Sequence, residues 1–197
     1  MSVWDGTRLQ PGLLPSRLIN DFFIFEPSLV NGAYITAGDL NGDGKADIIA
    51  GGGPSGGPRV FAVDAATLLA SDGTRLQPFA SFFAGDPNNR DGARVSVKDL
   101  DGDPFADLVV AASTGTGPVV FTYLGVSIVA NDSLQPFFGP EQVPGLFSGV
   151  FVGESRLVKT DGSARWGILQ QNRLGSGQPT IQGDGFLCSK DKRPNST

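Results

Sequence analysis

The chain repeats part of its sequence at an offset of 60 residues, and each copy contains an acidic loop of one design. The first loop reads Asp39-Leu-Asn-Gly-Asp-Gly-Lys-Ala-Asp47, and the second reads Asp99-Leu-Asp-Gly-Asp-Pro-Phe-Ala-Asp107. The register extends to Gly57-Pro58, which recurs as Gly117-Pro118. Repeats of this length are supersecondary units that bury their apolar faces against their neighbours. The sequence therefore predicts a repeat architecture.

Each copy divides into four short segments with the features of strands. In the first copy these segments are Tyr34 to Ala37, Ala46 to Ala50, Arg59 to Val63 and Leu76 to Phe83. The second segment is apolar except for Asp47, which indicates a strand buried on both faces. A helix over residues 65–70 is the alternative, but the segment is short and Asp72-Gly73 ends it, so we interpret it as a loop or a single turn. Four strands per unit are typical of a propeller blade.

The fold class predicted from this pattern is all-β, a partial β-propeller with about two four-stranded antiparallel blades and fragments of neighbouring blades. We expect the end of a preceding blade and a linker over 1–30, a first repeat over 31–90 and a second over 91–148. Residues 149–197 are interpreted as a degenerate or truncated third repeat and a polar tail, with an altered reading frame as the alternative. Because closed propellers need four or more blades, further blades or self-association would be required.

Composition excludes several classes of function. A formal net charge of −5 argues against nucleic acid as a partner. The 197 residues contain no long apolar run, so membrane insertion is not expected. The absence of histidine excludes Ser-His-Asp triads and His-ligated zinc, so we expect no enzyme activity. No signal peptide is visible at the N-terminus.

The acidic loops predict sites for a hard cation. Oxygen-bearing side chains at loop positions one, three, five and nine, with one backbone carbonyl, are suited to Ca²⁺. The expected ligands of the first loop are Asp39, Asn41, Asp43 and Asp47, with the carbonyl of Lys45. Those of the second loop are Asp99, Asp101, Asp103 and Asp107, with the carbonyl of Phe105.

Two alternatives to a calcium loop of this kind exist. An EF-hand begins in the same way, but it needs a Glu at position twelve and flanking helices, whereas this position is Ala50 and the flanks are strands. In the other alternative, the Asp and Asn side chains only cap tight turns. The second loop leaves both readings open, because Pro104 replaces Gly44 and proline cannot adopt a positive φ.

The order Gly-Asp-Leu-Asn-Gly-Asp-Gly-Lys-Ala-Asp from Gly38 to Asp47, with the Gly-Pro-Arg-Val-Phe that ends at Phe61, resembles the FG-GAP repeat of integrin α-chain propellers. It is more similar still to the long FG-GAP-type repeats of bacterial surface proteins, and the resemblance covers roughly residues 18–153. Leu18 to Phe25 resembles Leu76 to Phe83 and is expected to be the last strand of a preceding blade.

The resemblance implies a Ca²⁺ site between two strands of each blade and a role in adhesion or ligand recognition. It implies an extracellular or cell-surface location, with a protein or carbohydrate as the ligand. The alternative is an accessory propeller of a larger enzyme whose catalytic domain is absent from this chain.

Overall fold

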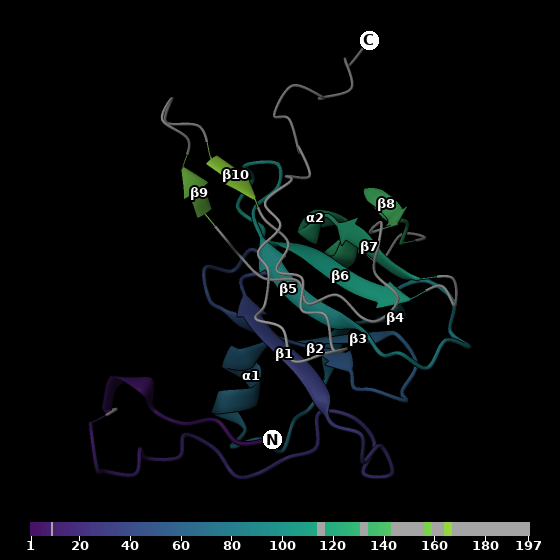
Figure 1. Cartoon of the computed structure of the whole chain (residues 1–197). Coiled ribbons are helices and arrows are strands. Elements are labelled where there is room, and N and C mark those ends of the chain that lie inside the picture. The colour runs from purple at the N-terminus through teal and green to yellow at the C-terminus, as the bar shows by residue number, and fades with distance from the viewer. Residues whose placement is uncertain (9, 114–116, 131–133, 143–155, 159–163, 167–197) are drawn as a thin grey trace.

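The computed structural model describes residues 1–8, 10–113, 117–130, 134–142, 156–158 and 164–166. Within these ranges the chain forms two four-stranded antiparallel sheets, a two-stranded sheet and short helices (Figure 1). The fold is therefore all-β, as predicted. The two larger sheets have the strand order expected for propeller blades, and the described residues do not show a closed propeller.

The first sheet contains β1 (Ala33–Gly38), β2 (Asp47–Gly52), β3 (Arg59–Val63) and β4 (Pro78–Phe83), in that spatial order. Gly38 pairs with Asp47 at the end of the sheet where the acidic loop joins β1 to β2. Every residue of β2 is buried. The apolar sequence of this strand therefore reflects cover on both faces, as predicted.

The second sheet repeats this arrangement with β5 (Arg94–Lys98), β6 (Asp107–Ser113), β7 (Pro118–Tyr123) and β8 (Phe138–Gln142). Lys98 pairs with Asp107, which is the pairing of Gly38 with Asp47 moved by the 60 residues of the repeat. The sequence repeat is thus also a repeat of strand register.

One prediction about the connection after β3 was wrong. Residues 65–70 form a helix, α1 (Ala65–Ala70), instead of a loop or single turn. The side chain of Asp64 caps it by accepting a hydrogen bond of 2.8 Å from the amide of Ala66, and Leu68 is fully buried. A cap and one buried contact stabilise a helix too short to have a clear periodicity. Its counterpart in the second repeat is α2 (Gly125–Ala130).

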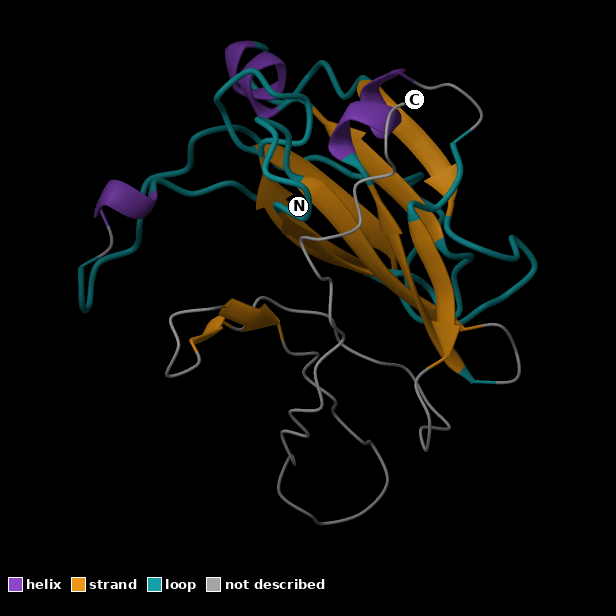
Figure 2. Ribbon diagram, turned by 90° about the horizontal axis from the view of Figure 1, so that it is seen from above, coloured by secondary structure: helices purple, strands orange, loops and turns teal. Residues whose placement is uncertain are grey.

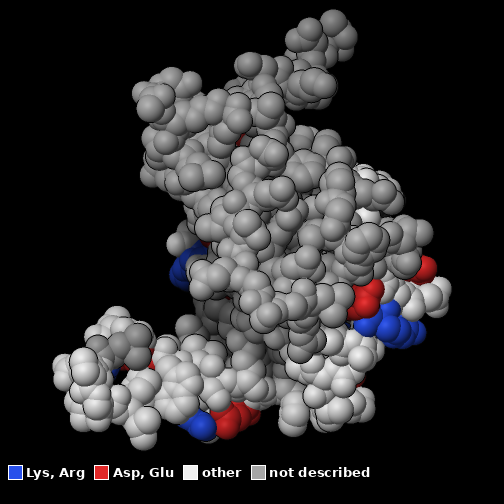
Figure 3. All heavy atoms as spheres, in the orientation of Figure 1, with Lys and Arg blue, Asp and Glu red and all other residues white. Residues whose placement is uncertain are grey.

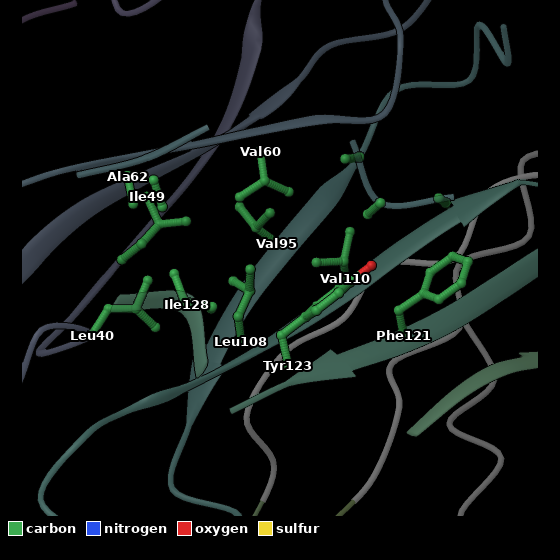
Figure 4. Close-up of a cluster of buried hydrophobic side chains, with 14 of the residues drawn as sticks. Leu40, Ile49, Val60, Ala62, Val95, Leu108, Val110, Phe121, Tyr123 and Ile128 are labelled. Atoms are coloured by element: carbon green, nitrogen blue, oxygen red, sulfur yellow. The ribbon is translucent and has the colours of Figure 1, made fainter. Parts of the chain in front are cut away.

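The two four-stranded sheets pack against each other through β1 and β5. Figure 2 shows their strands as adjacent layers, and Figure 4 shows side chains of both sheets in one apolar cluster. Glycine permits this close approach at Gly51, where an added Cβ would lie 1.9 Å from the carbonyl oxygen of Ala93. The contact between the repeats therefore depends on backbone surfaces as well as on apolar side chains.

The N-terminal residues cover the other face of the first sheet but do not supply the expected strand. Apart from an isolated bridge between Trp4 and Arg17, residues 1–30 form no strand within the described part of the chain, and η1 (Gly6–Arg8) is one turn of 3-10 helix. Ile19, Ile24 and Phe25 are nevertheless buried in a cluster with residues of β2, β3 and α1. Leu18 to Phe25 thus occupies a packing position without the strand pairing that we predicted for it.

The C-terminal segment is described only in part. Two short strands, β9 (Arg156–Val158) and β10 (Ala164–Trp166), form an antiparallel pair. The proposed opening of a third repeat at Gly149 to Gly153 lies outside the described residues.

Charged side chains of both signs are found on the described surface. In Figure 3 the visible acidic and basic groups lie next to one another in small mixed groups. Among the described residues, no helix is long and apolar enough to span a membrane.

Candidate metal centre

The two acidic loops occupy equivalent places in the two sheets. Each connects the first strand of its sheet to the second, and the last acidic residue of each loop, Asp47 or Asp107, is also the first residue of the second strand. Strands flank both loops, which confirms the prediction that distinguished them from an EF-hand. The sheets therefore place two similar sets of oxygen atoms at the same structural position.

Asp47 is the buried base of the first loop, with 1% of its surface exposed. Its Oδ2 accepts hydrogen bonds from the backbone amides of Leu40, at 3.0 Å, and Asn41, at 3.1 Å. Its Oδ1 accepts a further bond of 3.1 Å from the side-chain amide of Asn41. Burial nevertheless raises the pKa of Asp47 to about 6, because removal from water disfavours the ionised carboxylate more than these donors stabilise it.

The other side chains of the first loop hold its turn together. Asp39 accepts hydrogen bonds from the amides of Asp43, at 3.0 Å, and Gly44, at 2.8 Å. Asn41 also accepts from the amide of Asp43, and Asp43 accepts from that of Lys45. These are the turn-capping bonds of the alternative interpretation. They leave lone pairs on the same oxygens, so they are compatible with cation binding as well.

Asp107 is the corresponding base of the second loop and is fully buried. Its Oδ2 accepts a hydrogen bond of 2.6 Å from the amide of Leu100, and its Oδ1 accepts one of 2.9 Å from the amide of Gly125. Burial also raises the pKa of Asp107 to about 6, with smaller contributions from the charges of Asp101 and Asp103. Both loops thus place a carboxylate where ionisation is unfavourable unless positive charge is near.

The second loop gathers three carboxylates closely. Single oxygens of Asp99, Asp101 and Asp107 all lie within 4.8 Å of one another. Two ligands at the usual Ca²⁺–oxygen distance of about 2.4 Å can be at most about 4.8 Å apart, so this donor set fits one hard cation. Among the described residues, this is the place where three such groups meet, since Asn41 replaces the second carboxylate in the first loop.

The sharp turn differs between the loops, as the sequence predicts. Gly44 has a φ of 82°, in the left-handed region that proline cannot adopt. Pro104 also lacks an amide hydrogen, and Asp99 instead accepts a hydrogen bond of 2.6 Å from the amide of Gly102. The carboxylates of Asp99, Asp101 and Asp107 meet despite this change, whereas that of Asp103 is not part of this group. Whether either loop binds a metal stays a prediction.

Two contacts at these loops could not be predicted from the acidic motif. The amide of Ala106 donates a hydrogen bond of 2.6 Å to the carbonyl oxygen of Asp39, which joins the two loops directly. The bond from Gly125 to Asp107 comes from the start of α2, which lies 18 residues further along the chain. For the bond from Gly125, the sequence signal is weak because it consists of a single glycine. In the structure, a Cβ added to Gly125 would lie 2.3 Å from the carbonyl oxygen of Ala106.

Comparison with known proteins gives a family for the first repeat. Residues 31–63 match the family model of the FG-GAP repeat, and this segment includes β1, the first acidic loop, β2 and β3. Searches of curated proteins and of solved structures gave no match. The segment 31–63 is therefore an FG-GAP repeat, as its sequence predicts.

Proposed function

We propose that this chain is a non-catalytic, calcium-binding module of FG-GAP-type repeats, with a structural, adhesive or ligand-binding role in a larger exported protein. The observation that supports it most is the repeated placement of oxygen donors around a buried aspartate, Asp47 or Asp107, at the junction of two strands. A β-rich repeat of this family is typical of surface proteins.

In this proposal Ca²⁺ stabilises the junction between the first and second strands of each sheet. Asp39, Asn41, Asp43 and Asp47, with the Lys45 carbonyl, hold the ion in the first loop. Asp99, Asp101, Asp103 and Asp107, with the Phe105 carbonyl, hold it in the second. The ion supplies positive charge beside a carboxylate that burial would otherwise make costly to ionise.

A non-catalytic role is supported by the chemistry of the side chains. The chain has no histidine, and its clustered carboxylates accept hydrogen bonds from the backbone of their own loops. In this proposal, a complete propeller recognises a protein or carbohydrate. Further blades of the same protein, or additional copies of this chain, would complete that propeller. The partner is the part of the proposal that depends most on family analogy.

The test is calorimetric titration of the full chain with CaCl₂, together with melting temperatures in Ca²⁺ and in chelator. Binding with a rise in melting temperature is expected, because a ligand that binds only the folded state stabilises it. Asp43→Ala should lower stability in Ca²⁺ and change it little in chelator. Asp72→Asn is the matched control, because Asp72 holds the backbone and side chain of Asn20 outside both loops. An absence of both binding and a thermal shift refutes the proposal.

A further inference from the structure

The two acidic loops are in direct contact through atoms next to their predicted ligands. Asp39 is the first ligand of the first loop, and its carbonyl oxygen accepts the hydrogen bond from Ala106 at 2.6 Å. In the second loop, Ala106 lies between the predicted carbonyl ligand of Phe105 and the buried carboxylate of Asp107. A shift of either ligand segment therefore acts on the other through one short hydrogen bond.

Side-chain packing reinforces this contact. The ring of Phe105 lies against Gly42 at the tip of the first loop, where an added Cβ would be 2.7 Å from a ring carbon. Leu40 of the first loop is fully buried in the same cluster as Leu108 and Ile128 of the second repeat. Figure 4 shows Leu40 beside Ile128. The first loop is thus positioned by the second repeat as well as by its own strands.

The second loop has its own fixed support on one side. Gly125 donates to Asp107 and packs against the carbonyl of Ala106, whereas Asp99 and Asp101 are exposed. An ion that draws these two exposed carboxylates to Asp107 would fix the segment that donates to Asp39. A loop that is already fixed loses less conformational entropy when it binds its own ion.

Electrostatic repulsion between two bound ions does not oppose this effect strongly. The first loop carries three carboxylates and Lys45, and the second carries four carboxylates. A divalent ion therefore leaves neither loop with a net positive charge.

From these contacts we propose that the two loops bind Ca²⁺ as a coupled pair, in which an ion in one loop strengthens binding in the other through the contacts of Phe105 and Ala106 with the first loop. The inference rests on the proposed calcium function and adds a regulation of those same sites.

The test is calorimetric titration of the full chain with CaCl₂ in variants that disable one loop at a time. Asp99→Ala removes a ligand of the second loop and is expected to weaken binding at the first by at least about fivefold, the lower end of typical coupling. Asp43→Ala removes a ligand of the first loop and should weaken the second by the same factor, because coupling between binding sites is reciprocal.

A second pair of variants tests the route of the coupling. Phe105→Ala keeps every carboxylate, the carbonyl of Phe105 and the hydrogen bond from Ala106 to Asp39, so it should lower the coupling factor while two ions still bind. Binding of two ions also shows that both loops remain folded. Asp72→Asn should leave the factor unchanged, because Asp72 binds Asn20 outside both loops.

The outcomes separate this inference from the proposed function. Two ions whose affinities do not respond to loss of the other loop would overturn the coupling and leave calcium binding intact. A single ion per wild-type chain would also overturn the coupled pair. No binding at all would remove the proposed function itself.

Discussion

Replacement of Asp47 by Asn should have opposite effects on stability in chelator and in Ca²⁺. Asp47 has 1% of its surface exposed, and burial raises the pKa of its carboxyl from 3.8 to about 6. At 1.36 kcal/mol per pKa unit, this corresponds to a cost of about 3 kcal/mol for the ionised, folded form at neutral pH. The cost exists only while no cation compensates the charge.

The direction of the pH dependence follows from this shift. Between about pH 4 and pH 6 the folded chain binds more protons at Asp47 than the unfolded chain, because the folded pKa is the higher one. In chelator, the contribution of Asp47 to the free energy of unfolding therefore falls as pH rises through this window, and the full cost remains above it. Asp107 should contribute in the same direction.

Asp47→Asn removes the charge but leaves an acceptor for the amides of Leu40 and Asn41. Its new amide group would face the side-chain amide of Asn41, which now donates to Asp47, and this offsets about 1 kcal/mol of the gain. We expect the variant to be about 1–2 kcal/mol more stable than wild type in chelator at pH 7.5. In saturating Ca²⁺ it should be less stable, because a charged ligand is lost.

Urea denaturation at pH 4.5, 6.0 and 7.5, in chelator and in Ca²⁺, measures these differences in the free energy of unfolding. Asp72→Asn is the control, and it should change the free energy of unfolding equally in chelator and in Ca²⁺. Equal destabilisation by Asp47→Asn in chelator and in Ca²⁺ would falsify the reasoning. That result would mean that the carboxylate serves the turn alone.

Other predictions concern the scaffold. Gly51→Ala would place its Cβ against the carbonyl oxygen of Ala93 and should destabilise the chain by about 3 kcal/mol in urea denaturation. Arg59→Ala removes cation–π contacts with Phe25 and Phe61, whose ring centroids lie 5.7 and 5.3 Å from the guanidinium carbon, and should cost about 1–2 kcal/mol in the same assay. Asp64→Ala removes the cap of α1 and should lower stability by about 1 kcal/mol, equally with and without Ca²⁺.

The strands of the two repeats were predictable because their signals are local. Apolar segments bounded by glycine, proline and acidic turns indicated β1 to β4, and the 60-residue offset carried the assignment to the second sheet. Helix α1 was missed because its stability comes from a cap and from tertiary burial of Leu68. Leu18 to Phe25 was misassigned because similarity to Leu76 to Phe83 does not provide a neighbouring strand with which to pair.

The candidate site was predictable one loop at a time. Spacing within each loop identified the oxygen donors, but the hydrogen bond from Ala106 to Asp39 depends on how the two sheets pack. That packing is set by close backbone approaches such as the one at Gly51, for which the sequence shows only a glycine. Relations between repeats therefore required the structure.

The difference between Gly44 and Pro104 gives the two loops unequal dependence on a cation. In the first loop, the amides of Asp43 and Gly44 both donate to Asp39, and an uncharged Asn41 occupies the third position. The second loop has no amide hydrogen at Pro104 and a fourth carboxylate, Asp101.

More negative charge with fewer donors raises the repulsion within the second loop when no ion is bound. The second loop should therefore gain the most from Ca²⁺ in stability, while the first keeps much of its turn through its own hydrogen bonds. Since Phe105 and Ala106 of the second loop contact the first, ordering of the second loop by its ion should prepare the first loop, while the coupling free energy is the same in both directions.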